Sequence, residues 1–206
     1  IVFSRRDTPN EIIYGVSFSV KHAEELELDW REVYLAIMDD LKVKNIRLSA
    51  HWDMIELADE AFSFVELDHQ MSEAEKRGVK VILGVGRRLP GWPECHDPSW
   101  VKDLGQKEKQ EKILDYIETV VERYKYSPVL RFWQVENEPF LRFAYEYCGS
   151  TDEDFLSREI ALVKKLDPKH PVLITDSGEM GLWYKARKYG DVFGTSVYLY
   201  IWHDVL

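Results

Sequence analysis

Phe132-Trp133-Gln134-Val135-Glu136-Asn137-Glu138-Pro139 is an apolar strand that stops at a carboxylate beside an amide and a proline. Asp, Asn, Glu and Pro fit the interior of a strand poorly, so Asn137, Glu138 and Pro139 mark the rim of a sheet. Glu136 alternates to the opposite face from Asn137, and we expect it to support the structure rather than to react. The stretch therefore predicts a strand that presents polar side chains where chemistry can take place.

The composition limits the classes of partner. The chain has 206 residues, and 27 basic against 37 acidic side chains give a net charge of −10. This balance disfavours nucleic acid and anionic membrane surfaces, and neutral polyhydroxylated ligands are easier to accommodate. Seven Trp and eleven Tyr supply faces that can pack against sugar-like surfaces, although most of them are expected to fill a core. No apolar run approaches the length of a membrane span.

The organisation predicts a single domain over residues 1–206, because no linker, charge block or repeat interrupts the chain. Cys95 and Cys148 lie far apart without a CxxC spacing, so neither a disulfide framework nor a zinc knuckle is expected. The pattern favours two unlinked thiols over one disulfide. Localisation stays open, because this cysteine content fits either side of a membrane.

Short apolar runs alternate with longer amphipathic ones along the whole chain. Six strands that alternate with five helices predict a parallel sheet, because each crossover helix returns the chain in the same direction. Strands are predicted over residues 12–18, 45–49, 79–85, 129–135, 171–175 and 192–199, and helices over 30–41, 64–76, 110–124, 155–166 and, more weakly, 180–189.

Two architectures fit this alternation: a doubly wound sheet and a barrel. A doubly wound nucleotide-binding fold places a glycine-rich turn after its first strand, and residues 16–21 have no such glycines. Polar and aromatic residues instead follow strand after strand, and in a barrel these ends meet over one mouth. We therefore predict an α/β fold, a (β/α)₈ TIM barrel that is incomplete, with about six βα units present.

At three places the sequence resembles that of a large clan of retaining glycoside hydrolases, which includes cellulases, mannanases, β-glucosidases and β-galactosidases. These places are Asn137-Glu138-Pro139 after the fourth strand, Arg47 at the second and Tyr198 at the sixth. Members of this clan are (β/α)₈ barrels with an acid/base Glu after strand four and a nucleophilic Glu after strand seven. The resemblance implies hydrolysis of O-glycosidic bonds in a β-linked oligo- or polysaccharide by double displacement, with no metal or organic cofactor.

The resemblance also gives each of these residues a role. Glu138 would be the acid/base, with a pKa raised by burial or by the negative nucleophile. Asn137 would hydrogen-bond the sugar 2-hydroxyl. Arg47 would orient the nucleophile through charge-assisted hydrogen bonds, with a structural ion pair inside the barrel as the alternative. Tyr198 would hydrogen-bond the nucleophile or pack in the core.

Further candidates follow other strands. His51 and Trp52 could line a sugar subsite, Trp52 as a stacking face, and packing in the interior is the equal alternative. Asp176 ends the fifth strand and is a candidate substrate contact. Arg87 and Arg88 follow the third strand, where salt bridges are favoured over binding to hydroxyls or to an acidic sugar.

The sequence departs from the clan at its end. It stops at Leu206 after the sixth strand, so no position matches the nucleophile, and the open barrel edges are expected to favour self-association. A noncatalytic barrel that binds carbohydrate or protein is therefore the alternative function. A metal-dependent hydrolase is a weaker one, because no HxH or HExxH spacing supports its candidate ligands, which are His51, Asp53, His96, Glu138 and Asp176.

Overall fold

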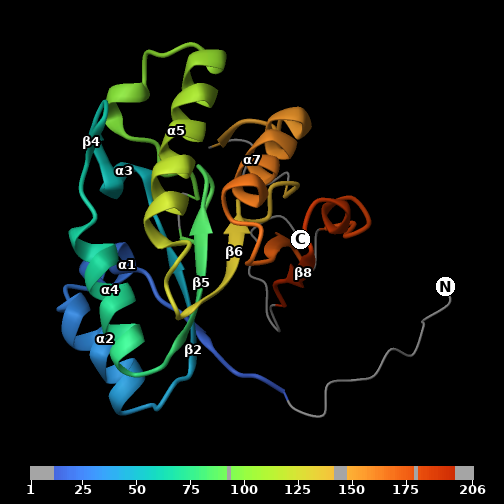
Figure 1. The fold of residues 1–206 in the computed structure, drawn as a ribbon. Coiled ribbons are helices and arrows are strands. Elements are labelled where there is room, and N and C mark those ends of the chain that lie inside the picture. Colours follow the sequence, from blue (N-terminus) through green and yellow to red (C-terminus); the bar gives the residue numbers. More distant parts are fainter. Residues whose placement is uncertain (1–11, 92–93, 142–147, 179–180, 198–206) are drawn as a thin grey trace, which may run out of the picture.

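The computed structural model describes residues 12–91, 94–141, 148–178 and 181–197, and its centre is a curled parallel sheet (Figure 1). Each strand lies beside its predecessor in the chain, whereas a doubly wound sheet reverses its order at a switch point. The sheet is thus part of a (β/α)₈ barrel, as predicted. Its strands, in spatial order, are β1 (Val16–Ser17), β2 (Asn45–Ser49), β5 (Lys80–Val85), β6 (Leu130–Val135), β7 (Val172–Asp176) and β8 (Val192–Thr195).

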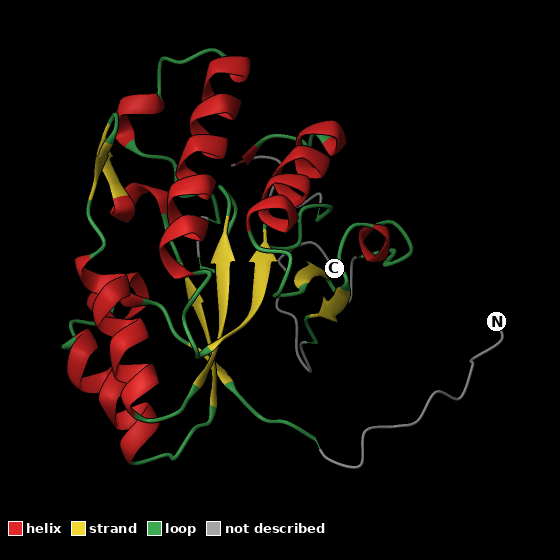
Figure 2. Cartoon of the chain, viewed as in Figure 1, coloured by secondary structure: helices red, strands yellow, loops and turns green. Residues whose placement is uncertain are grey.

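The helices lie on the outer side of the strands (Figure 2). Two of the long ones begin at carboxylate caps: Asp29 accepts from the backbone N–H of Arg31, and Asp152 accepts from that of Phe155. The helices are α1 (Val20–Glu25), α2 (Trp30–Asp39), α3 (Trp52–Ile55), α4 (Val65–Lys76), α5 (Gln106–Tyr124) and α7 (Glu153–Leu166); β3 (Glu56–Ala58) and β4 (Ala61–Phe62) form a separate hairpin.

Alternation along the strands separates the core from the inner face of the sheet. On β2, Ile46 and Leu48 are buried, whereas Arg47 faces the hollow inside the curled sheet. On β6, Trp133 is fully buried and its indole N–H donates to Asp167 Oδ2 at 2.8 Å. Apolar side chains therefore fill the layer between sheet and helices, and the inner face carries polar side chains such as Arg47 beside apolar ones such as Ile82.

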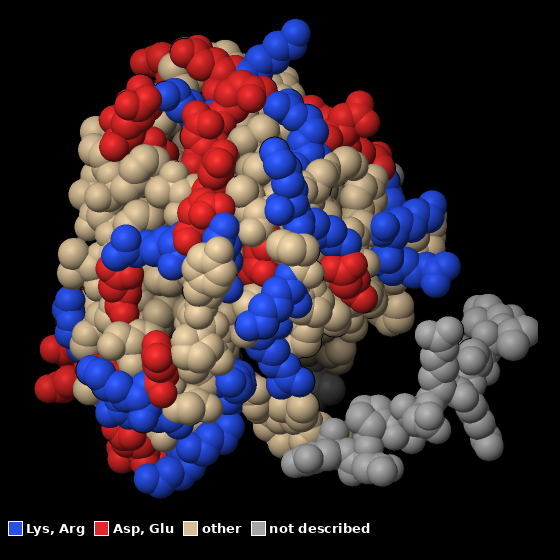
Figure 3. Space-filling view, viewed as in Figure 1, with Lys and Arg blue, Asp and Glu red and all other residues tan. Residues whose placement is uncertain are grey.

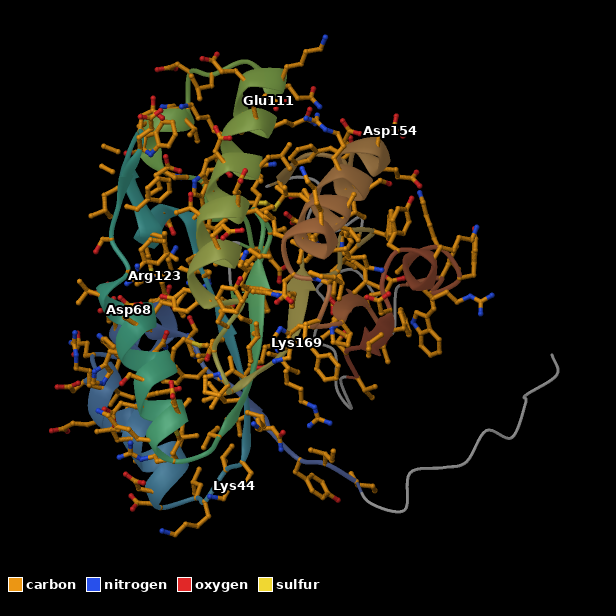
Figure 4. All side chains as sticks on the ribbon, in the orientation of Figure 1. Lys44, Asp68, Glu111, Arg123, Asp154 and Lys169 are labelled. Carbon is orange, nitrogen blue, oxygen red and sulfur yellow. A yellow bond between two sulfur atoms is a disulfide. The ribbon has the colours of Figure 1, made fainter. Side chains whose placement is uncertain are left out.

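Charged side chains tie the outer helices together. Arg123 on α5 donates to Asp68 on α4, with 2.8 Å between Nε and Oδ1, and the two labelled side chains face each other in Figure 4. Acidic and basic side chains are interspersed over the helical face in Figure 3. Within the described ranges, no helix combines the length and the apolar character that crossing a lipid bilayer requires.

The structure differs from the predicted elements in three places. Only Val16–Ser17 of the predicted strand 12–18 is paired, because Ile12, Ile13 and Tyr14 are exposed and lie outside the sheet. In the described part of residues 180–189, a short 3₁₀ turn at Ala186–Lys188 replaces the weak helix. The short helices α1 and α3 and the hairpin were not predicted, because elements this short show little periodicity. Self-association through the edge strands β1 and β8 stays a prediction.

Candidate active site

The segment that follows β6 turns sharply at two residues. Glu136 and Glu138 have φ values of 58° and 43°, in the left-handed region that side chains other than glycine seldom adopt. The Glu136 carboxylate accepts hydrogen bonds from the backbone N–H groups of Arg87 and Arg88, both at 2.7 Å. Glu136 therefore ties the loop after β6 to the loop after β5, which confirms its expected structural role.

Asn137 is fixed at both ends of its amide. Its Oδ1 accepts from Gln134 Nε2 at 3.1 Å and from the Thr175 hydroxyl at 3.4 Å. Its Nδ2 donates to Glu94 Oε2 at 3.2 Å, and its backbone N–H donates to the Arg88 carbonyl at 2.7 Å. The amide is therefore oriented before any ligand arrives.

Glu138 lies beside this amide with its side chain largely buried; the residue is 9 % exposed. Its backbone N–H donates to Thr175 Oγ1 at 3.0 Å, so one hydroxyl on β7 contacts both Asn137 and Glu138. Sequence reasoning missed Thr175, because a threonine near the end of a strand is an ordinary β-forming residue.

Burial raises the pKa of the Glu138 carboxyl, and the negative charges of Glu94 and Asp176 add to the effect. A hydrogen bond with Ser196 and the positive charge of Arg88 lower that pKa in part. A carboxyl whose pKa is raised keeps its proton to a higher pH, which is the requirement for a general acid.

The inner face of the sheet forms a hollow of about 450 Å³ around these groups. Arg47 on β2 lines it together with Asn137 and Glu138; its Nε donates to Ser17 Oγ at 2.8 Å and its Nη1 to Gln134 Oε1 at 3.4 Å. Gln134 thus connects Arg47 to Asn137. A second hollow, of about 410 Å³, shares four lining residues with the first: Ser17, Arg47, Pro90 and Gly91.

Comparison with known families identifies the chain. Residues 14–189 match the model of glycosyl hydrolase family 10. The chain belongs to this family. Asn137 and Glu138, the buried pair that follows the fourth strand of the sheet, lie within the part of the chain that matches family 10.

The chain is also similar to curated relatives and, in its fold, to solved structures. The family 10 chain is 33% identical over 129 residues to a probable mannan endo-1,4-beta-mannosidase F of Aspergillus flavus. This match covers 56% of the chain and 26% of that relative. The chain therefore spans about a quarter of the length of the curated relatives it matches. The fold is similar to a β-galactosidase of Halorubrum lacusprofundi (TM-score 0.65, 16% identity, 89% of this chain and 40% of that one). It is also similar to a glycosylated endo-beta-1,4-xylanase of family 10 from Gloeophyllum trabeum (TM-score 0.62, 18% identity, 88% and 60%).

The structure does not present Trp52 as a stacking face. In this family 10 chain Trp52 is fully buried, its indole N–H donates to Glu56 Oε2 at 2.7 Å, and its ring packs 5.9 Å from Tyr116. The prediction of a sugar platform is therefore wrong, and the packing alternative holds. The reason is that the chain turns into α3 at this point and directs the indole into the core.

His51 is likewise buried, so it packs in the interior, which was the alternative to lining a sugar subsite. Its ring lies 4.0 Å from that of His96, and burial, followed by the charges of His96 and Lys21, lowers its pKa well below the ordinary value. Lys21 Nζ donates to Asp53 Oδ1 at 2.7 Å and contacts His96 Nδ1 at 2.8 Å. Burial and Lys21 lower the pKa of His96 to about 4, so both rings are neutral at pH 7.

Asp176 serves the backbone and does not line the hollow around Glu138. Its Oδ1 accepts from the N–H of Ser177 at 3.0 Å and its Oδ2 from the N–H of Trp183 at 3.1 Å. The structure therefore gives no support to its role as a substrate contact.

Among the described residues, no three His, Cys, Asp or Glu side chains are placed to hold a metal ion, so the alternative of a metal-dependent hydrolase finds no set of ligands there. Tyr198 lies outside the described residues, and its role stays a prediction.

Cys95 and Cys148 form a disulfide with 5.6 Å between their Cα atoms, so the expectation of unlinked thiols is wrong. Nothing in the sequence indicated this bond between residues 53 apart, because it is the fold that brings together the loops after neighbouring strands.

Arg87 and Arg88 form ion pairs, as the sequence analysis favoured: Arg87 with Asp97 at 2.6 Å and Arg88 with Glu94 at 3.4 Å.

Proposed function

We propose that this family 10 chain belongs to a retaining glycoside hydrolase that cleaves β-linked oligo- or polysaccharides, with Glu138 as the acid/base. The observation that carries the proposal is the buried Glu138 carboxyl beside a fixed Asn137 amide at the mouth of the barrel. The names of the relatives are compatible with this class of reaction, since each is named as a glycoside-cleaving enzyme.

In the first step, Glu138 gives its proton to the departing glycosidic oxygen while a second carboxylate attacks the anomeric carbon. The resemblance places this nucleophile after the seventh strand of a complete barrel. In the second step, the Glu138 carboxylate takes a proton from the water that breaks the glycosyl–enzyme bond. The raised pKa of Glu138 favours the protonated form that the first step needs.

Asn137 has a complementary task. A hydrogen bond between its amide and the sugar 2-hydroxyl would strengthen as positive charge develops on the ring. Gln134 and Thr175 hold its Oδ1, so the Nδ2 group points to the side where Glu94 and the hollow lie. The amide is therefore oriented in advance, which is the condition for stabilising a transition state.

The test is Glu138→Gln in the protein expressed at its full natural length, with exposed Glu60→Gln as the matched control. We expect release of reducing sugar from soluble β-mannan, β-xylan or β-galactoside to fall by a factor of about 10²–10⁴, because general acid–base catalysis contributes that much. Binding of the same glycan by calorimetry should persist. Proton NMR of the first product should show the anomeric configuration of the substrate.

The noncatalytic alternative gives the opposite pattern. Wild-type protein would then bind glycan without releasing reducing sugar, and Glu138→Gln would change neither measurement. A first product with inverted configuration would exclude the retaining mechanism, since inversion needs a water between the two carboxyl groups.

A further inference from the structure

The loop after β5 brings an unassigned carboxylate to the hollow. Arg88 and Cys95 pair as an isolated β-bridge, and the Glu94 N–H donates to the Gly91 carbonyl at 2.6 Å. Glu94 has φ 75°, and the disulfide of its neighbour Cys95 to Cys148 fixes the loop at this point. The loop thus holds Glu94 in a defined position rather than leaving it solvated.

Within the described part of the chain, the hydrogen bonds of the Glu94 carboxylate involve one of its two oxygens. Oε2 accepts from Asn137 Nδ2 at 3.2 Å and from Arg88 Nε at 3.4 Å. Across the ranges that the structure describes, Oε1 has no hydrogen-bond partner, and the side chain is 21% exposed and lines the hollow with Asn137 and Glu138. A carboxylate oxygen at this place is an acceptor beside the amide that orients a sugar.

We propose that Glu94 is a specificity-determining residue, whose carboxylate accepts a hydrogen bond from a hydroxyl of the sugar ring at Asn137 and selects neutral sugars over uronic acids. This inference rests on the proposed function. A hydroxyl can donate to Glu94, and bonds to a charged acceptor are stronger than neutral ones. A uronate carboxylate at the same place would meet a like charge in a partly desolvated hollow.

The two arginines nearby are both bound to groups of the protein. The buried Arg88 guanidinium is directed away from a ligand, since it donates to the carbonyl oxygens of Pro139 at 3.5 Å and Leu141 at 3.4 Å. Arg47 lines the same hollow and donates to Ser17 and Gln134. The Glu94 carboxylate is therefore a charged acceptor directly beside the Asn137 amide.

The experiment compares wild type, Glu94→Gln, Glu94→Asp and the control Glu60→Gln in the full-length protein. The probes are a neutral hexose oligosaccharide that the wild type cleaves and its C6-oxidised uronate counterpart. For Glu94→Gln we expect KM for the neutral substrate to rise about tenfold or more, because a charge-assisted hydrogen bond is lost. The preference for neutral over uronate substrate should fall by a similar factor, while Glu94→Asp keeps that preference because it keeps the charge.

Binding to the same probes by calorimetry, in a Glu138→Gln background, separates this inference from the proposed function. A tenfold weaker affinity for the neutral probe on adding Glu94→Gln supports the role of Glu94 whether or not the protein hydrolyses glycans. If KM, affinity and preference in Glu94→Gln all match those of Glu60→Gln at an unchanged melting temperature, the inference is overturned. A preference lost equally in Glu94→Asp and Glu94→Gln would also overturn selection by charge.

Discussion

Glu136 and Glu159 are both buried, and they line one interior cavity together with Arg87 and Arg88. Burial raises the pKa of Glu159 well above its ordinary value, and the negative charge of Glu136 adds to the effect. Burial also raises the pKa of Glu136, but the N–H groups of Arg87 and Arg88 lower it in part. Glu159 therefore holds the proton and Glu136 the charge.

Stability should depend on pH through Glu159. Its pKa is raised in the folded protein, so its contribution is fully present below about pH 4.5, the ordinary value, and is lost as the pH rises through the raised pKa. Glu159→Gln supplies a permanently neutral donor to Glu136. We expect its free energy of unfolding to fall less between pH 5 and pH 8 than that of wild type, measured by urea unfolding. Parallel pH curves for the two proteins would contradict this assignment.

Gly86 is required by the Glu136 contact. Its φ is 113°, and a Cβ at this position would lie 2.3 Å from Glu136 Oε1. Gly86→Ala should lower the free energy of unfolding by about 2–3 kcal/mol and reduce kcat, because backbone strain and a displaced Glu136 act together. Gly78→Ala is the control: its φ is 63° with nothing within 4 Å of the added Cβ, so only the backbone term of about 1 kcal/mol applies. Equal losses in the two variants would show that the clash is relieved.

The disulfide should stabilise both the fold and the site. Replacing Cys95 and Cys148 by Ser opens a link between residues 53 apart, and the expected loss is about 2–4 kcal/mol in guanidinium unfolding. KM should also rise, because the released loop carries Glu94. Wild type with its disulfide reduced should behave like the double variant, and an unchanged unfolding midpoint would contradict the prediction.

The pH profile of turnover should respond to Glu94. Glu138 must be protonated to act, so kcat/KM falls as the pH rises through its raised pKa. Glu94→Gln removes a negative charge that raises this pKa, and the basic limb of the profile should therefore move to lower pH. Glu60→Gln serves as the charge-matched control. A basic limb that stays in place in Glu94→Gln would separate Glu94 from the titration of Glu138.

Trp52 should matter for stability and not for binding. Trp52→Phe removes the buried donor of Glu56, so we expect a loss of about 1–3 kcal/mol in the free energy of unfolding. KM for glycan should not change, because the ring faces Tyr116 and Trp100 in the core. A raised KM with unchanged stability would restore the stacking role considered from the sequence.

The sequence predicted those parts of the fold that depend on periodicity. Period two alone predicted that the side chains of Glu136 and Asn137 have different surroundings, and in the structure Glu136 contacts the backbone of Arg87 whereas Asn137 contacts Gln134. The position of Glu138 at the rim followed from residue types that strands exclude. The barrel order followed from the regular alternation of strands and helices.

The missed parts depend on contacts between loops. Glu94 lies in an aperiodic loop with a left-handed backbone, where no pattern of residue types indicates its neighbours. Its contact with Asn137 joins positions 43 residues apart. The prediction for Trp52 was wrong because this residue begins the short helix α3, which directs its side chain into the core. A helix of four residues is too short to show a period in the sequence.

The Cys95–Cys148 bond also affects how the protein has to be produced. Reducing cytosol keeps thiols unpaired, whereas oxidising compartments allow the bond to form. Material purified from these two kinds of recombinant host would share one amino-acid sequence but differ in the covalent state of the loop beside Asn137. A thiol titration of each preparation is therefore needed before glycan affinities from different laboratories are compared.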